Sequence, residues 1–309
     1  MPSACYIAGT ISCGAAGLAT VQVSPLEHND KEIIAKGHSQ MSTVMPSIAS
    51  PTPTAVTALF ERDGFLSVDS LTTAADIELI RSLLDPLFDK FDTLGERAVD
   101  LAGPRQSGVP LRSPEVNEAI RLEPRLRSTL AYARCREIAS MLLGTPVGYQ
   151  FDHAIFKPPM NQTPTAWHQD EAYSTEPMPL RSIHFWIPLQ PVTVDNGCMW
   201  FIPGSNRTAL LPHYVASRRF NGPQSQTTAV TLATKIVDES KAVACPLPVG
   251  GATIHHPLTL HYTGPNQTDA WRKAWILHFG AYGWLRRRFH PKVLAAKLGV
   301  GTRRPNFAT

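Results

Sequence analysis

Residues 167–170 read WHQD, so an imidazole and a carboxylate stand two positions apart in His168 and Asp170. On an extended segment, residues two apart point to the same side, so these two groups can converge on one point. His261 supplies another imidazole about 90 residues later, just before a Gly-Pro-Asn turn at residues 264–266. Two imidazoles and one carboxylate on one face of a metal leave the other positions open for a bidentate 2-oxo acid and dioxygen. Such a ligand set is typical of mononuclear non-haem iron(II) oxygenases.

A 2-oxo dicarboxylic acid also needs an anchor for its far carboxylate, and Arg272 is the candidate. A guanidinium group binds a carboxylate through two parallel hydrogen bonds and stays charged in a pocket. Taken alone, Arg272 between Trp271 and Lys273 fits a surface arginine. Its position eleven residues after His261, on the next predicted strand, favours the anchor. Thr263 can add a hydroxyl hydrogen bond to the same carboxylate.

Other histidines near these positions leave alternatives open. His255 and His256 lie close to His261, and strand periodicity does not exclude them as the third ligand, because a bulge changes which side a residue faces. His153 fits either a substrate-facing role or a buried, hydrogen-bonded structural role. Tyr173 can border the site, although packing is the favoured role for this side chain.

The elements that position these residues are predicted from hydrophobic spacing. Residues 1–54 show no sustained period, which predicts a disordered tail or an extension ahead of a start at Met41 or Met45. Helical spacing follows, first with a cap at Thr72 or Thr73 and again at 113–143. Short strands come after Gly144, at residues 150–157, 182–189, 197–202, 251–260 and 272–279. This order predicts an α+β domain over 55–290, built around an antiparallel double-sheet barrel, with a basic tail at 291–309.

Composition excludes several other classes of protein. The formal net charge is +4 and the basic residues are scattered except at 286–288, so no nucleic-acid-binding stripe is expected. The five cysteines form no CxxC pair, which argues against a disulfide framework and a cysteine zinc site. No apolar run is long enough to span a membrane, and residues 1–25 lack the charges of a targeting signal. We therefore expect a cytoplasmic protein that acts on a small molecule.

Several spaced motifs resemble those of the phytanoyl-CoA dioxygenase family over residues 59–279. The chain carries KPP at 157–159, WHQD at 167–170, DNGCMWFIPGS at 195–205 and LHYTGPN at 260–266, followed by Arg272. The resemblance implies a double-stranded β-helix, or cupin-like jelly-roll, with flanking helices. One departure is Asn206, where many family members have histidine, and it affects no ligand assignment.

The same resemblance implies the roles of individual residues. Iron(II) would be bound by His168, Asp170 and His261, and 2-oxoglutarate by Arg272. Lys157, Trp186 and Thr263 fall where family members line the co-substrate pocket.

The resulting hypothesis is an iron(II)- and 2-oxoglutarate-dependent dioxygenase that hydroxylates a small organic metabolite and releases succinate and carbon dioxide. Asp170 favours hydroxylation, because related halogenases carry Gly or Ala there and use the free position for halide. A zinc hydrolase is an alternative, since the same ligands suit zinc, but it leaves Arg272 without a role. A non-catalytic jelly-roll binding module is the other alternative, and it has no need of the complete ligand set. Residues 213–241 are the expected variable lid, and the sequence predicts neither the substrate nor the oligomeric state.

Overall fold

The computed structural model describes residues 5–10, 24–25, 52–103, 110–174, 181–220 and 228–281, and its core is made of two β-sheets. The larger sheet has nine strands. In spatial order they are β2 (Ser24–Pro25), β1 (Cys5–Thr10), β3 (Phe65–Ser70), β13 (Ala252–His255), β8 (Ser182–Pro188), β15 (Arg272–Ala281), β6 (Val147–Lys157), β5 (Pro114–Asn117) and β4 (Ala98–Asp100). All pairs are antiparallel except β1 with β3.

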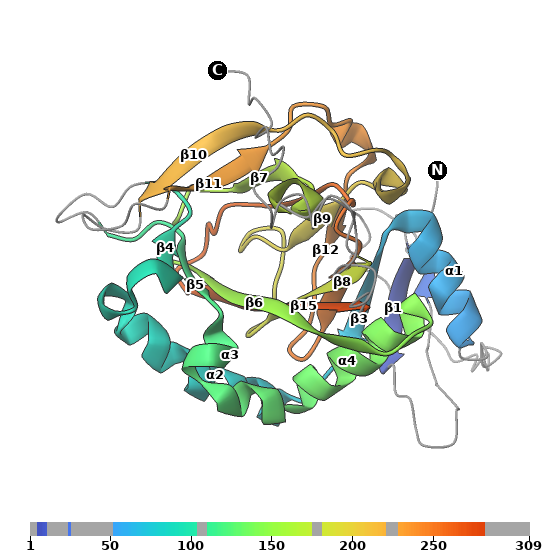
Figure 1. Cartoon of the computed structure of the whole chain (residues 1–309), viewed down its shortest axis with the longest axis horizontal. Coiled ribbons are helices and arrows are strands. Elements are labelled where there is room, and N and C mark those ends of the chain that lie inside the picture. The colour runs from blue at the N-terminus through green and yellow to red at the C-terminus, as the bar shows by residue number, and fades with distance from the viewer. Residues whose placement is uncertain are drawn as a thin grey trace, which may run out of the picture.

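The smaller sheet has four antiparallel strands, and a separate hairpin lies beside it. The order is β12 (Val243–Cys245), β9 (Met199–Phe201), β14 (His261–Thr263) and β7 (Thr165–His168), and the hairpin is β10 (Tyr214–Phe220) with β11 (Thr228–Ala233). In Figure 1 the hairpin and β7 lie at the top of the barrel, and the helices labelled α2, α3 and α4 lie at the bottom.

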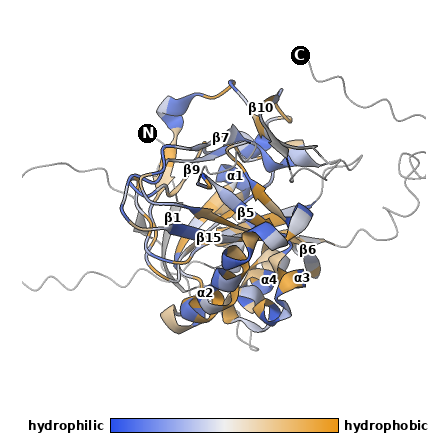
Figure 2. Ribbon diagram, turned by 90° about the vertical axis from the view of Figure 1, so that its left-hand side faces the viewer, coloured by the Kyte–Doolittle hydropathy of each residue, from blue (hydrophilic) through white to orange (hydrophobic). Residues whose placement is uncertain are grey.

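The helices begin and end where capping residues require it. Helix α1 (Pro53–Asp63) has Thr52 as its N-cap and ends at Gly64, whose φ is 82°. Helix α2 (Ala74–Asp89) is capped by Thr73, one of the two predicted caps. The remaining helices are α3 (Ala119–Leu122) and α4 (Leu130–Leu143). Figure 2 shows α2, α3 and α4 together beneath the larger sheet, with hydrophobic and hydrophilic residues mixed along each helix.

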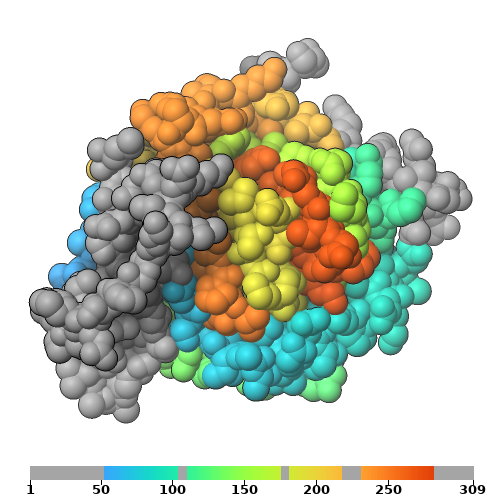
Figure 3. Space-filling model, turned by 180° about the vertical axis from the view of Figure 1, so that it is seen from behind, coloured from blue at the N-terminus to red at the C-terminus, as the bar shows by residue number. Residues whose placement is uncertain are grey.

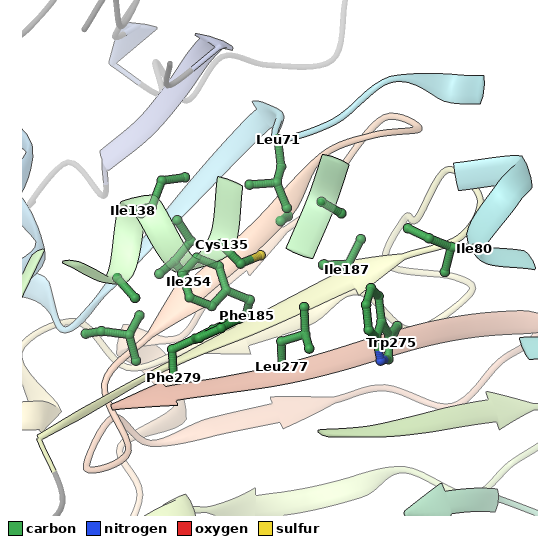
Figure 4. Packing of buried hydrophobic residues seen from close by; sticks show 14 of the residues in the cluster. Leu71, Ile80, Cys135, Ile138, Phe185, Ile187, Ile254, Trp275, Leu277 and Phe279 are labelled. Atoms are coloured by element: carbon green, nitrogen blue, oxygen red, sulfur yellow. The ribbon is translucent and has the colours of Figure 1, made fainter. Parts of the chain in front are cut away.

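Alternation along the strands separates two hydrophobic clusters. On β15, Trp275, Leu277 and Phe279 join the cluster under the helices, whereas Ala274 and Ile276 join a second cluster with residues of the smaller sheet. On β8, Phe185 packs toward the helices, where Figure 4 shows it near Cys135 of α4, and Trp186 faces the other way. The interior of the barrel is therefore lined by every second residue of these strands.

The predicted strands match the structure except around His255. Residues 251–260 were predicted as one strand with His261 near its end, but the strand ends at His255 and His261 instead begins β14 in the smaller sheet. A turn separates them, in which Thr259 N–H donates to the carbonyl of His256 at 2.8 Å. The hairpin β10–β11 was not predicted.

The predicted tails lie mostly outside the described residues. Within 1–54, the segments Cys5–Thr10 and Ser24–Pro25 are strands at the edge of the larger sheet, so these two short segments are not irregular. The basic tail at 291–309 and the arginine run at 286–288 lie outside the described ranges. Among the helices that the structure describes, none has the length and apolarity needed to cross a membrane.

Candidate metal and co-substrate site

His168, Asp170 and His261 come together where the smaller sheet meets the start of a short 3-10 helix, Asp170–Tyr173. The two histidines are direct partners across β7 and β14, and their ring centroids are 4.1 Å apart. Asp170 Oδ1 lies 3.3 Å from His168 Nε2 and 3.4 Å from His261 Nε2. One ligand atom from each residue can therefore reach a shared metal ion.

Hydrogen bonds fix which ring nitrogen of each histidine is free. His168 Nδ1 lies 2.7 Å from the carbonyl of Ala166, and His261 Nδ1 lies 2.9 Å from the carbonyl of Thr259. A carbonyl oxygen can only accept, so both Nδ1 atoms carry a hydrogen, and Nε2 is the nitrogen of each ring that faces Asp170 and that a metal ion can take as its ligand. Backbone carbonyls commonly orient metal-binding histidines in this way.

The second carboxylate oxygen of Asp170 is held by two further histidines. Asp170 Oδ2 accepts hydrogen bonds from His184 Nδ1 at 2.7 Å and from His255 Nε2 at 3.2 Å. Burial alone would raise the pKa of Asp170. The charge of His261 and the hydrogen bonds from His168, His184 and His255 outweigh burial and hold that pKa well below its usual range. Asp170 is therefore an ionised carboxylate in a buried site.

The structure separates His261 from the two neighbouring histidines that competed with it. His255 lies on β13 and contacts Asp170 through Oδ2, whereas His261 faces Oδ1 together with His168. His256 accepts a hydrogen bond from the backbone N–H of Leu258 at 3.1 Å and does not join the group. Burial lowers the pKa of His255 to about 3 and that of His256 to about 4. Both are neutral imidazoles at neutral pH.

Lys157 and Arg272 form the other part of the site. They are direct partners across β6 and β15, and both are buried. Lys157 Nζ donates to Thr263 Oγ1 at 3.0 Å and to the carbonyl of Gly264 at 2.8 Å. Arg272 lies 5.5 Å from the ring of Trp186, and its Nε has no hydrogen-bond partner among the described residues. Burying two cations is costly unless an anion accompanies them, so this arrangement favours binding of a carboxylate.

The electrostatics of this pair agree with that interpretation. Burial and the charge of Arg272 hold the pKa of Lys157 well below its usual range, and burial lowers the pKa of Arg272 to about 10. Thr263 stands two residues after His261 on β14, so the cation pair lies about 7 Å along the strand from a candidate metal ligand. That spacing suits a five-carbon dicarboxylate that reaches both.

Turns from the second half of the chain close this end of the barrel. Gln267 N–H donates to the carbonyl of Asp195 at 2.8 Å, and Gly197 lies against the backbone of Gly264. Figure 3 shows these yellow and red segments side by side on the face opposite to that of Figure 1. Lys157 and Arg272 are thereby kept from water.

The remaining sequence candidates have structural partners. His153 Nδ1 lies 2.5 Å from Glu115, and Tyr173 accepts a hydrogen bond from the N–H of Leu232 at 2.8 Å. Asn206 donates to the carbonyl of Glu61 at 3.0 Å, so the departure at this position ties the chain to α1. The predicted lid includes the β10–β11 hairpin, from which Ser217 and Thr231 both donate to the carbonyl of Leu101.

His184 was missed by sequence reasoning. It stands two residues before Trp186 on a predicted strand, so its parity already indicated that both side chains face the same way. The contact with Asp170 depends on how the segment after β7 folds against β8, which no local pattern reveals.

Comparison with known proteins gives a family and a fold. The sequence model of the family "Phytanoyl-CoA dioxygenase (PhyH)" matches residues 60–274. The chain is 31% identical over 159 residues to phytanoyl-CoA dioxygenase domain-containing protein 1 of Bos taurus, covering 51% of this chain and 53% of that protein. It is 24% identical over 241 residues to the human peroxisomal phytanoyl-CoA dioxygenase, covering 72% and 66%. The chain thus spans about half the length of the curated relatives that it matches at about 30% identity.

Solved structures show the same architecture. EvdO2 from Micromonospora carbonacea var. aurantiaca, complexed with 2-oxoglutarate, is 31% identical with a TM-score of 0.58, covering 73% of this chain and 89% of that one. The epimerase SnoN, in complex with Fe3+, alpha ketoglutarate and nogalamycin RO, is 23% identical with a TM-score of 0.55, covering 74% and 83%, and supports the fold alone. These matches confirm the predicted cupin-like fold and the predicted family resemblance.

Proposed function

The chain belongs to the phytanoyl-CoA dioxygenase family, and we propose that it binds iron(II) through His168, Asp170 and His261 and hydroxylates a small organic molecule with 2-oxoglutarate and dioxygen. The observation that carries the proposal is the linkage of two groups along β14. His261 belongs to the ligand group, and Thr263, on the same strand, accepts from Lys157 beside Arg272. A metal chelator with a second carboxylate fits this arrangement, because its chelating end can reach the ligand group and its second carboxylate can reach Lys157 and Arg272.

The residues present suit iron(II). Two imidazole nitrogens and one carboxylate oxygen form the donor set that non-haem iron(II) takes on one face, and both imidazoles present Nε2 with Nδ1 fixed by a carbonyl. Iron(II) bound there would supply, with 2-oxoglutarate and dioxygen, the oxidation that converts 2-oxoglutarate to succinate and carbon dioxide.

The protein itself contributes binding, orientation and exclusion of water. Arg272 and Lys157 neutralise the far carboxylate of 2-oxoglutarate in a buried site, where each hydrogen bond is stronger than in water. The ring of Trp186, beside the Arg272 guanidinium, fixes one wall of this site. Asp170 occupies the position that a halide takes in related halogenases, which supports hydroxylation as the outcome.

The experiment is succinate formation by the purified protein, tested with iron(II), with zinc and without metal, in the presence of a panel of small organic metabolites. Iron-dependent succinate that increases with one metabolite, together with a gain of one oxygen by mass spectrometry, is the expected result. Turnover with zinc and without 2-oxoglutarate would favour the hydrolase alternative, which leaves the buried pair Lys157 and Arg272 without an anion. The predicted cytoplasmic location stays a prediction, since one relative is named as peroxisomal.

A further inference from the structure

The two carboxylate oxygens of Asp170 face different sets of histidines. Oδ1 lies 3.3 and 3.4 Å from the Nε2 atoms of His168 and His261. Oδ2 lies 2.7 Å from His184 Nδ1 and 3.2 Å from His255 Nε2. The first set belongs to the proposed iron site, and the second set has no role in the function proposed above.

The larger sheet places this second set with precision. His184 on β8 and His255 on β13 are direct cross-strand partners, and both are buried. Their ring centroids are 5.4 Å apart with an interplanar angle of 79°, so an Nδ1 of one ring and an Nε2 of the other can meet at a single oxygen. His184 is further fixed by stacking on His278, at 3.6 Å and 6°.

Hydrogen-bond chemistry sets the protonation of both rings. An ionised carboxylate only accepts, so His184 carries hydrogen on Nδ1 and His255 carries it on Nε2. Ser182 Oγ lies 3.2 Å from His184 Nε2 and then donates to it. Two N–H donors consequently occupy Oδ2, and no ring of this set presents a lone pair to that oxygen.

We propose that His184 and His255 are positioning residues that keep Asp170 a one-oxygen ligand of the metal. Because both donors hold Oδ2, only Oδ1 faces the side of His168 and His261. The one further coordination position that a chelating carboxylate would fill is thus kept available to 2-oxoglutarate or dioxygen. This inference rests on the proposed iron site and names the residues that shape it.

A second metal site is the competing interpretation of the same cluster. Ligand atoms of Asp170, His184 and His278 lie within 4.8 Å of one another. The rings of His184 and His278 are nearly parallel, however, and lone pairs in the planes of parallel rings do not converge on one ion. The short contact between His184 and Asp170 is the length of a charge-assisted hydrogen bond.

The test uses side chains that imitate one ring nitrogen each. An asparagine amide at position 184 can replace the Nδ1 donor, and a glutamine amide at position 255 can replace the more distant Nε2 donor. The variants are His184→Ala, His184→Asn, His255→Ala and His255→Gln on the full chain, with His256→Ala as the matched control. Three quantities are measured in the absence of oxygen. They are the iron(II) dissociation constant, the number of irons bound per chain, and the charge-transfer absorption of the protein in complex with iron and 2-oxoglutarate. The melting temperature of the metal-free protein shows whether each variant is folded.

We expect the alanine variants to bind iron(II) about 10- to 100-fold more weakly. At saturating iron and 2-oxoglutarate they should still show a weakened charge-transfer absorption, because a carboxylate free to chelate competes with the 2-oxo acid. His184→Asn and His255→Gln should recover most of both properties, and His256→Ala should match the wild type. A loss of stability alone would lower the melting temperature without changing the absorption of the loaded, folded protein.

Several results would overturn the inference and leave the proposed function standing. These are alanine variants with wild-type affinity and absorption, amide variants no better than alanine, or two irons per chain that both depend on His184. Failure of the proposed function has a different signature, in which the wild-type chain binds no iron(II) or His168→Ala binds it equally well.

Discussion

Lys157 and Arg272 stand opposite one another on β6 and β15 with both side chains buried, so two basic groups face each other inside the barrel and would carry like charges if both were protonated. Like charges at directly opposed positions destabilise a sheet. Thr263 and Gly264 satisfy Lys157 with neutral oxygens, and no acidic partner of either cation lies within the described part of the chain. The pair therefore makes the ligand-free protein less stable than it would be with an anion bound.

The lowered pKa of Lys157 predicts proton uptake when 2-oxoglutarate binds. Burial and the charge of Arg272 favour the neutral amine in the ligand-free protein. The carboxylate of 2-oxoglutarate favours the ammonium form, so between the ligand-free and the ligand-bound pKa of Lys157 binding takes up a proton, and in that pH range affinity falls as pH rises. Calorimetry of the metal-loaded protein without oxygen, at mildly alkaline pH in two buffers of different ionisation enthalpy, measures this uptake. Lys157→Met should lose the buffer dependence, and equal heats in both buffers for the wild type would contradict the prediction.

Removal of any one proposed metal ligand should abolish hydroxylation. His168→Ala, Asp170→Ala and His261→Ala each delete one donor of the group, leaving too few protein ligands to hold iron(II) at working concentrations. His255→Ala and His256→Ala should keep a measurable fraction of activity, because neither ring faces Oδ1 of Asp170. Iron content and succinate formation are the measurements. Iron lost in His256→Ala but kept in His261→Ala would mean that the third ligand is misassigned.

A glycine beneath the co-substrate site should be intolerant of a side chain. Gly197 has a φ of 85°, and a Cβ there would lie 2.6 Å from the carbonyl oxygen of Gly264, which also accepts from Lys157. Gly197→Ala should lower the free energy of unfolding by about 2 kcal/mol or more and raise the KM for 2-oxoglutarate. Gly95→Ala is the control, since Gly95 has a φ of 59° and nothing within 4 Å of an added Cβ. Gly95→Ala should lower the free energy of unfolding by only about 1 kcal/mol, the cost of placing a side chain in the left-handed backbone region. Equal losses of unfolding free energy in both variants would argue against a steric cause at Gly197.

Local geometry along the chain is enough to predict the positions of several candidate site residues. His168 ends β7 and Asp170 begins the 3-10 helix with the extended residue Gln169 between them, so the two groups converge as their spacing predicts, and Arg272 begins a strand as predicted. His184 and the hairpin β10–β11 depend on pairing between distant segments. Lys157 and Thr263, which are 106 residues apart in the chain, meet only because β6 and β14 lie in facing sheets. The turn that ends β13 at His255 likewise depends on a tertiary contact, the hydrogen bond from His256 N–H to the carbonyl of Gly64.

Arg272 is the proposed anchor for the far carboxylate of 2-oxoglutarate. Without the Arg272 guanidinium, 2-oxoglutarate can still chelate iron through its 2-oxo acid end, so the site should be weakened and not destroyed. Charge-assisted hydrogen bonds contribute about 1.5 to 3 kcal/mol each, and a guanidinium fork can make two. Arg272→Ala should therefore raise the KM for 2-oxoglutarate by about a hundredfold or more, with less effect on iron content.

Arg272→Lys should fall between the wild type and Arg272→Ala, because an ammonium keeps the charge but cannot form the fork. Arg121→Ala is the matched control, since the Arg121 side chain is 63% exposed and pairs only with Glu118 of its own turn among the described residues. Succinate formation against 2-oxoglutarate concentration, at saturating iron and primary substrate, gives the KM. If Arg272→Ala keeps the wild-type KM for 2-oxoglutarate, Arg272 is not the anchor. The buried cation pair would then no longer argue against the zinc-hydrolase alternative.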